Sequence, residues 1–138
     1  MVEYREKILK VLAEIKGSGD NYVSFPAIAY KVVPELRQIE EEIVSMGRLD
    51  RILPSGILTE EDKHLARVIY IDTPKIRQER RKLSAKRRAI LISVLHNLWN
   101  LVEEGYLKVT SCHGDLLTDE SDMVYSWYIT DKVKEVRQ

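Results

Sequence analysis

Apolar residues recur at helical spacing along most of the N-terminal third of the chain. Over residues 4–16 they fall on one face, which predicts an amphipathic helix. A shorter helix is predicted over residues 25–32, because Ser24 can cap its first turn. A third helix is predicted over residues 35–46, and Gly47 is well placed to end it.

The longest helical pattern begins at Lys75, after which neither glycine nor proline occurs until Gly105. At about 1.5 Å per residue, one continuous helix here would be about 45 Å long. The alternative is two helices that meet near Ser84, which can act as a cap. Before this stretch, residues 48–53 suit a strand and residues 59–71 suit a helix. The second half of the long pattern carries an apolar face that we expect in the core: Ile90, Leu91, Val94, Leu95, Leu98, Leu101 and Val102.

Two runs near the C-terminus are rich in β-branched and aromatic residues, which is typical of strands. We pair residues 106–111 with residues 124–130 as an antiparallel hairpin across a loop at 112–123. Residues 22–23 are a further candidate strand, and residues 131–138 are a candidate helical tail. The expected fold class is therefore mainly α with a small antiparallel β-hairpin.

The length of 138 residues suits a single compact domain over 1–138, or two small units in tandem over 1–58 and 59–138. An apolar fraction of 44% is sufficient for a core. Charged residues make up 32% of the chain while Asn and Gln are sparse, a balance typical of proteins from thermophiles.

Cys112 is the only cysteine, so the chain can form neither an intramolecular disulfide nor a cysteine-based zinc site. A lone cysteine favours a reducing compartment. No apolar run approaches the roughly 20 residues that span a bilayer. We therefore expect a cytoplasmic protein without a membrane partner.

The net charge is zero, but the positive charge is concentrated between residues 75 and 88, where Glu79 is the only acid. Lys and Arg bind DNA by neutralising its phosphates, so this block indicates a local anion-binding surface. The alternative is a solvated helix face that pairs with the acidic stretch 35–62. The candidate nucleic-acid-binding residues are Lys75, Arg77, Arg80, Arg81, Lys82, Lys86, Arg87 and Arg88.

Residues 84–136 resemble the second half of winged helix-turn-helix domains such as the MarR and ArsR repressors. Those domains pass from a recognition helix, through an ending like Leu101-Val102-Glu103-Glu104-Gly105-Tyr106-Leu107, into a two-stranded wing. The second wing strand often closes on a motif like Trp127-Tyr128-Ile129-Thr130 before a final helix. The resemblance implies a DNA-binding transcriptional regulator that reads duplex DNA, commonly as a homodimer.

Two arrangements of such a domain are compatible with the sequence. The helices at 4–16, 25–32 and 35–46 resemble a first helix-turn-helix unit, which would make the chain a tandem of two winged helices. If residues 25–32 are instead the second helix of one unit, about fifty residues intervene before its recognition helix. If residues 75–82 are the second helix, a tight turn near Ser84 follows.

Catalysis and cofactors are not expected, because no nucleophile–base pair or phosphate-binding glycine loop stands out. His64, His96 and His113 do not share a metal-ligand spacing. The alternative function is a winged-helix docking module in a replication, transcription or chromosome-handling complex, which would engage a protein partner through the acidic loop Asp115–Asp122. For the homodimer, two candidate interfaces are the long helix 75–104 and the apolar positions Ile8, Leu12 and Ile15.

The aromatic residues near the C-terminus allow two interpretations. Exposed aromatic rings can stack on nucleic-acid bases, but these rings are expected mainly in the core. They are Trp99, Tyr106, Tyr125, Trp127 and Tyr128.

Overall fold

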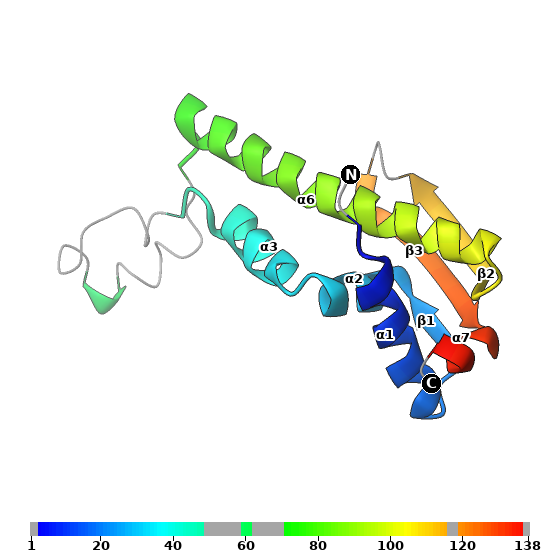
Figure 1. Ribbon diagram of the computed structural model, residues 1–138. Coiled ribbons are helices and arrows are strands. Elements are labelled where there is room, and N and C mark those ends of the chain that lie inside the picture. The colour runs from blue at the N-terminus through cyan, green and yellow to red at the C-terminus, as the bar shows by residue number, and fades with distance from the viewer. Residues whose placement is uncertain (1–2, 49–58, 62–70, 116–118, 137–138) are drawn as a thin grey trace. The chain divides into compact units, whose positions relative to one another are not determined.

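The computed structural model describes residues 3–48, 59–61, 71–115 and 119–136 (Figure 1). This part of the chain is mainly helical and contains a small antiparallel sheet, as the sequence predicts. Its principal elements are α1 (Arg5–Gly17), β1 (Tyr22–Ser24), α2 (Phe25–Val32), α3 (Glu35–Ser45), α6 (Pro74–Glu103), β2 (Leu107–Asp115), β3 (Asp119–Ile129) and α7 (Lys132–Val136).

The chain divides into two compact units. Unit 1 comprises residues 1–36 and 88–138, and unit 2 comprises residues 37–87. The boundaries therefore do not fall near residue 58, because the first elements of the chain pack with the last ones. Helix α6 is a single helix that contributes its first half to unit 2 and its second half to unit 1.

The sheet in unit 1 has three strands in the order β1-β3-β2, all antiparallel. The predicted hairpin is present, with Leu107 opposite Ile129 and Val109 opposite Trp127. The short N-terminal strand joins the hairpin, with Val23 opposite Trp127 on the other edge of β3. This pairing brings β1 and the C-terminal hairpin into one unit.

The prediction of a loop over residues 112–123 was wrong at both ends. β2 extends to Asp115 and β3 begins at Asp119, with Cys112 opposite Tyr125. The composition of these residues is typical of a loop. Main-chain hydrogen bonds in an antiparallel pair do not depend on side-chain polarity, so polar residues can continue both strands.

The core of unit 1 is formed by the apolar faces of α1, α2 and α6 and by the inner face of the sheet. Leu91, Val94, Leu95 and Leu98 are buried as predicted, whereas Val102 is only half-buried. The largest fully buried side chains of the core include Trp127, Phe25, Ile8, Leu12, Ile28, Leu98 and Leu101.

Helix α6 is continuous through Ser84, so the alternative of two helices was wrong. Its first turn is capped by the Thr73 hydroxyl, which accepts a hydrogen bond from the Ile76 N–H at 3.2 Å. At its end Gly105 has φ +89°, and the Tyr106 N–H donates to the Leu101 carbonyl at 3.0 Å. This left-handed glycine closes the helix and directs the chain into β2.

Lys16 fastens the C-terminal end of α1 to the end of β3. Its side chain is only 4% exposed, and its Nζ donates to the Ile129 carbonyl at 2.7 Å and to Asn21 Oδ1 at 2.9 Å. Asp131 Oδ1 lies 3.5 Å from the same nitrogen, and the Tyr128 ring lies 5.0 Å away. The buried ammonium therefore has several polar partners, as a buried charge requires.

Most of the predicted strand at 48–53 and most of the predicted helix at 59–71 lie outside the described residues; of the strand, Arg48 is described and forms a β-bridge. Of the predicted helix, Glu60 and Glu61 are helical. Within the described part of the chain, no helix is both long enough and apolar enough to cross a membrane.

Candidate nucleic-acid interface

The eight predicted binding residues all lie on α6, but they point to different sides of it. An α-helix turns about 100° per residue, so this block of fourteen residues cannot form a single face. Arg80 and Arg87 are half-buried, while the other six cations are exposed.

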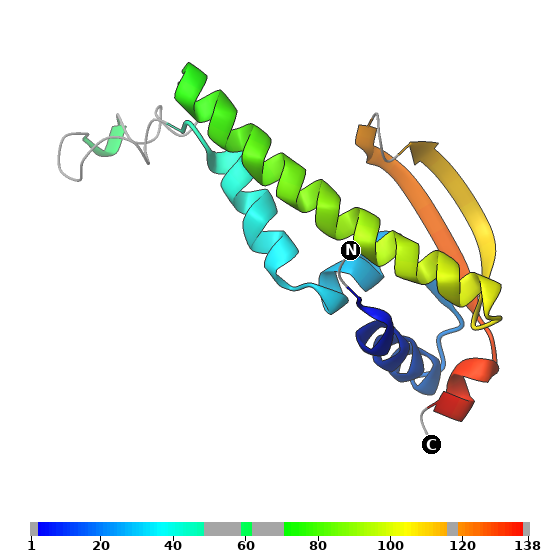
Figure 2. The ribbon, with the colours of Figure 1, turned by 45° about the horizontal axis from the view of Figure 1, so that its top comes forward.

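The two half-buried arginines fasten α6 to α3 within unit 2. Arg87 Nε donates to Glu40 Oε1 at 2.9 Å, and the two side chains are 20% and 26% exposed. Arg80 donates to the Met46 carbonyl at 3.1 Å, just beyond the end of α3. The two contacts run in opposite chain directions, so α3 and the first half of α6 are antiparallel neighbours (Figure 2).

The contact between Arg87 and Glu40 matches the alternative in which basic residues pair with the acidic stretch, whereas Arg80 bonds to a main-chain carbonyl. The sequence shows how dense the charge is, but not which side of the helix each charge faces. Arg80 and Arg87 are seven residues apart and therefore lie on the same side, together with the half-buried Ile76 and Leu83.

On one flank of α6, Lys75, Lys82 and Lys86 are exposed. None of the three forms an ion pair with an acidic residue that the structure describes. Their spacings of seven and four residues keep them in one row along the helix, which also contains the exposed Glu79, four residues after Lys75 and three before Lys82. We call the three lysines the lysine row.

Arg77 and Arg81 lie on the other flank and are also exposed. Arg77 Nε is 3.4 Å from Asp72 Oδ1, but both side chains are at least half exposed, at 50% and 61%. Exposed pairs of this kind contribute about 0–1 kcal/mol, so phosphate can displace the carboxylate. We call these two residues the arginine row. Arg88 is exposed too, but it belongs to unit 1 and is not without a partner.

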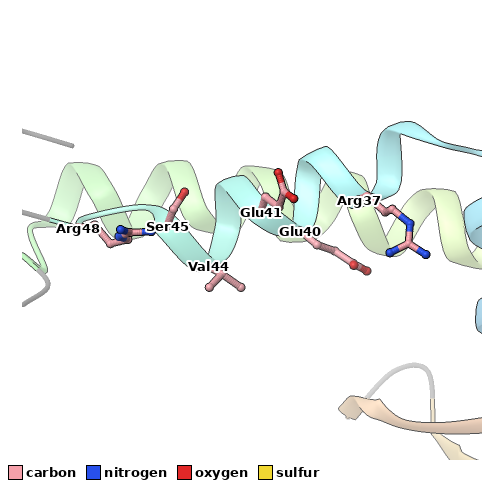
Figure 3. Close-up of a pocket in the computed structure, with 6 residues that line it drawn as sticks. All are labelled: Arg37, Glu40, Glu41, Val44, Ser45 and Arg48. Atoms are coloured by element: carbon pink, nitrogen blue, oxygen red, sulfur yellow. The ribbon is translucent and has the colours of Figure 1, made fainter. Parts of the chain in front are cut away.

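A pocket of about 440 Å³ lies along the outer side of α3 (Figure 3). Its lining is mixed in charge and includes Val44, which is 70% exposed. Glu40, one of its carboxylates, accepts the hydrogen bond from Arg87, so the pocket is held by the same contact that joins α3 to α6. The lining residues are Arg37, Glu40, Glu41, Val44, Ser45 and Arg48.

A second pocket, of about 320 Å³, lies in unit 1 beside the start of α1 and is lined by Glu3, Arg5, Asn97, Asn100, Glu103 and Glu104. Arg5 and Glu104 form an ion pair here, and their hydrogen bond raises the pKa of Arg5 above its ordinary value. Next to Arg5, partial burial and then the charge of Glu35 raise the pKa of Tyr4.

Neither pocket carries a metal site, since the described residues contain no group of three His, Cys, Asp or Glu side chains that could share a metal ion. His96 is exposed on α6. His64 lies outside the described residues.

Most of the aromatic residues pack rather than present open faces. Phe25, Trp99, Tyr125 and Trp127 form one cluster with ring centroids about 6.0–6.5 Å apart. Tyr106 is flanked by two cations, with Lys132 Nζ at 4.6 Å and the Arg5 guanidinium at 5.7 Å from its ring. Tyr128 packs edge-on against Tyr22.

One predicted dimer interface was wrong: Ile8 and Leu12 are fully buried in the core of unit 1, so they are not available to a partner. The apolar face of α6 is buried in the same core. The homodimer itself stays a prediction.

The acidic segment Asp115–Asp122 belongs largely to β2 and β3, and residues 116–118 lie outside the described part.

No family model, curated protein or solved structure matches the chain.

Proposed function

We propose that this protein binds duplex DNA through the first half of α6 and acts as a transcriptional regulator. The observation that carries the proposal is the exposure of five cations, the lysine row and the arginine row, within twelve residues of one helix. Glu79 is the only acid among those twelve residues. A chain with no net charge has no general affinity for polyanions, so a concentration of this kind points to a dedicated surface.

The order of elements in unit 1 supports the finer proposal that this unit is a winged helix-turn-helix. A helix closed by Gly105 leads into a two-stranded hairpin, and the hairpin leads into a short terminal helix. Helix α2 packs against α1 and β3, which favours α2 as the second helix of the unit. Unit 2 is then an insertion between this second helix and the second half of α6.

A protein docking module is the second candidate function. It is favoured by the internal use of Arg80 and Arg87, which leaves fewer cations for DNA, and by the exposed Val44 on the outer side of α3. A docking module would bind its partner with little dependence on the lysine row.

The test is binding of a labelled random-sequence duplex by the whole chain, followed by fluorescence anisotropy. We expect Arg81→Ala, Lys82→Ala and Lys86→Ala together to weaken binding at least tenfold. The matched control removes three exposed lysines from other elements, Lys7, Lys10 and Lys134, and should change affinity far less. Equal losses in the two triple variants would indicate nonspecific attraction, and no binding by the parent would favour the docking module.

A further inference from the structure

We infer that the first half of α6 lies lengthwise in the DNA major groove, with the lysine row on one phosphate backbone and the arginine row on the other. Gln78 then faces the base edges on the groove floor. This inference rests on the proposed function and specifies how the same surface holds its DNA. It concerns residues 75–86, which all belong to unit 2.

The two rows lie on opposite sides of a solvent-facing ridge. At about 100° per residue, the lysine row and the arginine row are separated by roughly 140° around the helix axis. Gln78 and Ala85 are seven residues apart and lie about midway between the rows. Both are exposed, and neither makes a contact with a described residue through hydrogen bonds or charge.

Helix α3 occupies the opposite side of α6, where Arg80 and Arg87 make their contacts. The ridge therefore points directly away from α3, and the neighbouring helix does not obstruct it. The two internal arginines act as positioning residues, since they fix the rotation of α6 relative to α3. That rotation determines which cations face outward.

The dimensions of the ridge suit B-form DNA. The major groove is about 12 Å wide and about 8.5 Å deep, and an α-helix with its side chains is about 10–12 Å across. From Lys75 to Lys86 the helix rises about 16 Å. With one phosphate per about 3.4 Å of axis on each strand, a row of that length can reach several phosphates of one backbone.

The two residues at the centre of the ridge, Gln78 and Ala85, can contact base edges. A glutamine amide can pair with N6 and N7 of adenine, and an alanine methyl group can contact the methyl group of thymine. Double-stranded RNA does not offer the same site to α6. Its A-form major groove is too deep and narrow for side chains to read.

The test measures the salt dependence of random-duplex binding for two charge-neutralised variants. The lysine-row variant is Lys75→Gln, Lys82→Gln and Lys86→Gln, and the arginine-row variant is Arg77→Gln and Arg81→Gln. We expect the slope of log K against log salt to flatten by about 2.7 and about 1.8, respectively, at about 0.9 per phosphate contact. Circular dichroism checks that each variant is folded. The control variant at Lys7, Lys10 and Lys134 shows how much of the change comes from a general loss of positive charge.

If neutralising one row flattens the slope and neutralising the other row leaves it unchanged, α6 lies against a single phosphate backbone. The placement in the groove is then overturned. Equal affinity for an RNA duplex of the same sequence would overturn it as well. If the parent binds no duplex at all, the proposed function itself fails, which is a separate outcome.

The role of Gln78 is tested by selection from a library of randomised duplexes. We expect Gln78→Ala to bind random duplex as the parent does, but to lose the preference for adenine at one position of the enriched sites. Enriched sites identical to those of the parent would overturn the base-facing placement of Gln78.

Discussion

At the scale of single residues, burial distinguishes three cations that bond within the protein from the three of the lysine row. Lys16 is buried and Arg80 and Arg87 are half-buried, and all three donate hydrogen bonds to carbonyl or carboxylate oxygens of the protein. Lys75, Lys82 and Lys86 stay in solvent. The sequence predicted the whole basic block as a binding surface, because residue type alone does not show which cations are already occupied.

Replacing Lys16 with Met should destabilise unit 1 by about 2–3 kcal/mol. The methionine preserves most of the packing, but the Ile129 carbonyl and the Asn21 side chain lose a charged donor, and such bonds contribute about 1.5–3 kcal/mol. Urea unfolding measures the change. Lys10→Met, on the exposed side of the same helix, is the control and should change stability by less than about 0.5 kcal/mol. If Lys16→Met also lowered stability by less than about 0.5 kcal/mol, the hydrogen bonds of Lys16 would not stabilise unit 1.

Two adjacent residues of α6 should respond in opposite ways when each is replaced by Ala. Arg87→Ala should lower stability by about 1–3 kcal/mol, because it removes a charged donor from the half-buried Glu40. Lys86→Ala should leave stability unchanged within about 0.5 kcal/mol but weaken binding to duplex DNA. Thermal unfolding and anisotropy on the same two preparations distinguish these effects. The opposite pattern would show that the inner and outer sides of α6 have been exchanged.

At the scale of elements, the helix and strand positions follow closely from the pattern of apolar residues and caps. Helix α2 begins and ends where Ser24 and Pro34 predict, and the Ser24 hydroxyl accepts a hydrogen bond from the Ala27 N–H at 3.4 Å. The extension of β2 and β3 could not be predicted in this way, because it depends on pairing between strands. The third strand could be expected as a strand, but its partner is more than a hundred residues away.

The turn after α3 depends on Gly47 for a reason that is visible only in the structure. Its φ is +85°, and an added Cβ would lie 2.5 Å from the Ile71 carbonyl oxygen. Gly47→Ala should therefore cost about 1–3 kcal/mol from backbone strain, together with the displacement of Ile71. Amide exchange at Ile71 reports the change, because its N–H donates to the Gly47 carbonyl at 2.7 Å.

Gly19 provides the control for this substitution. It also has a positive φ, of +96°, but an added Cβ there meets no atom within 4 Å. Gly19→Ala should show the strain alone and leave the exchange rate at Ile71 unchanged. If the two substitutions destabilise the protein equally, the close approach of Ile71 has no effect of its own.

At the scale of the whole molecule, the chain's own ends form one unit and its middle forms another. The local sequence signals allowed either a single domain or two units in tandem, because each helix and turn can be recognised without knowledge of its distant partners. The pairing of Val23 with Trp127 places the N-terminal strand and the C-terminal hairpin in one unit. No local pattern specifies a pairing between residues so far apart in the chain. The sequence predicts the basic segment of α6 as the candidate binding surface, but the division into inner and outer cations required the position of α3.

The central claim is that the exposed cations of α6 bind duplex DNA, and the most direct test is the affinity of the parent chain for a random duplex as salt is raised. If all five cations of the two rows contact phosphates, log K should fall against log salt with a slope of about −4.5. Nonspecific binding of this kind typically has a Kd of roughly 10⁻⁴–10⁻⁶ M at physiological salt. An absence of binding at low salt, or a slope near zero, would contradict the account.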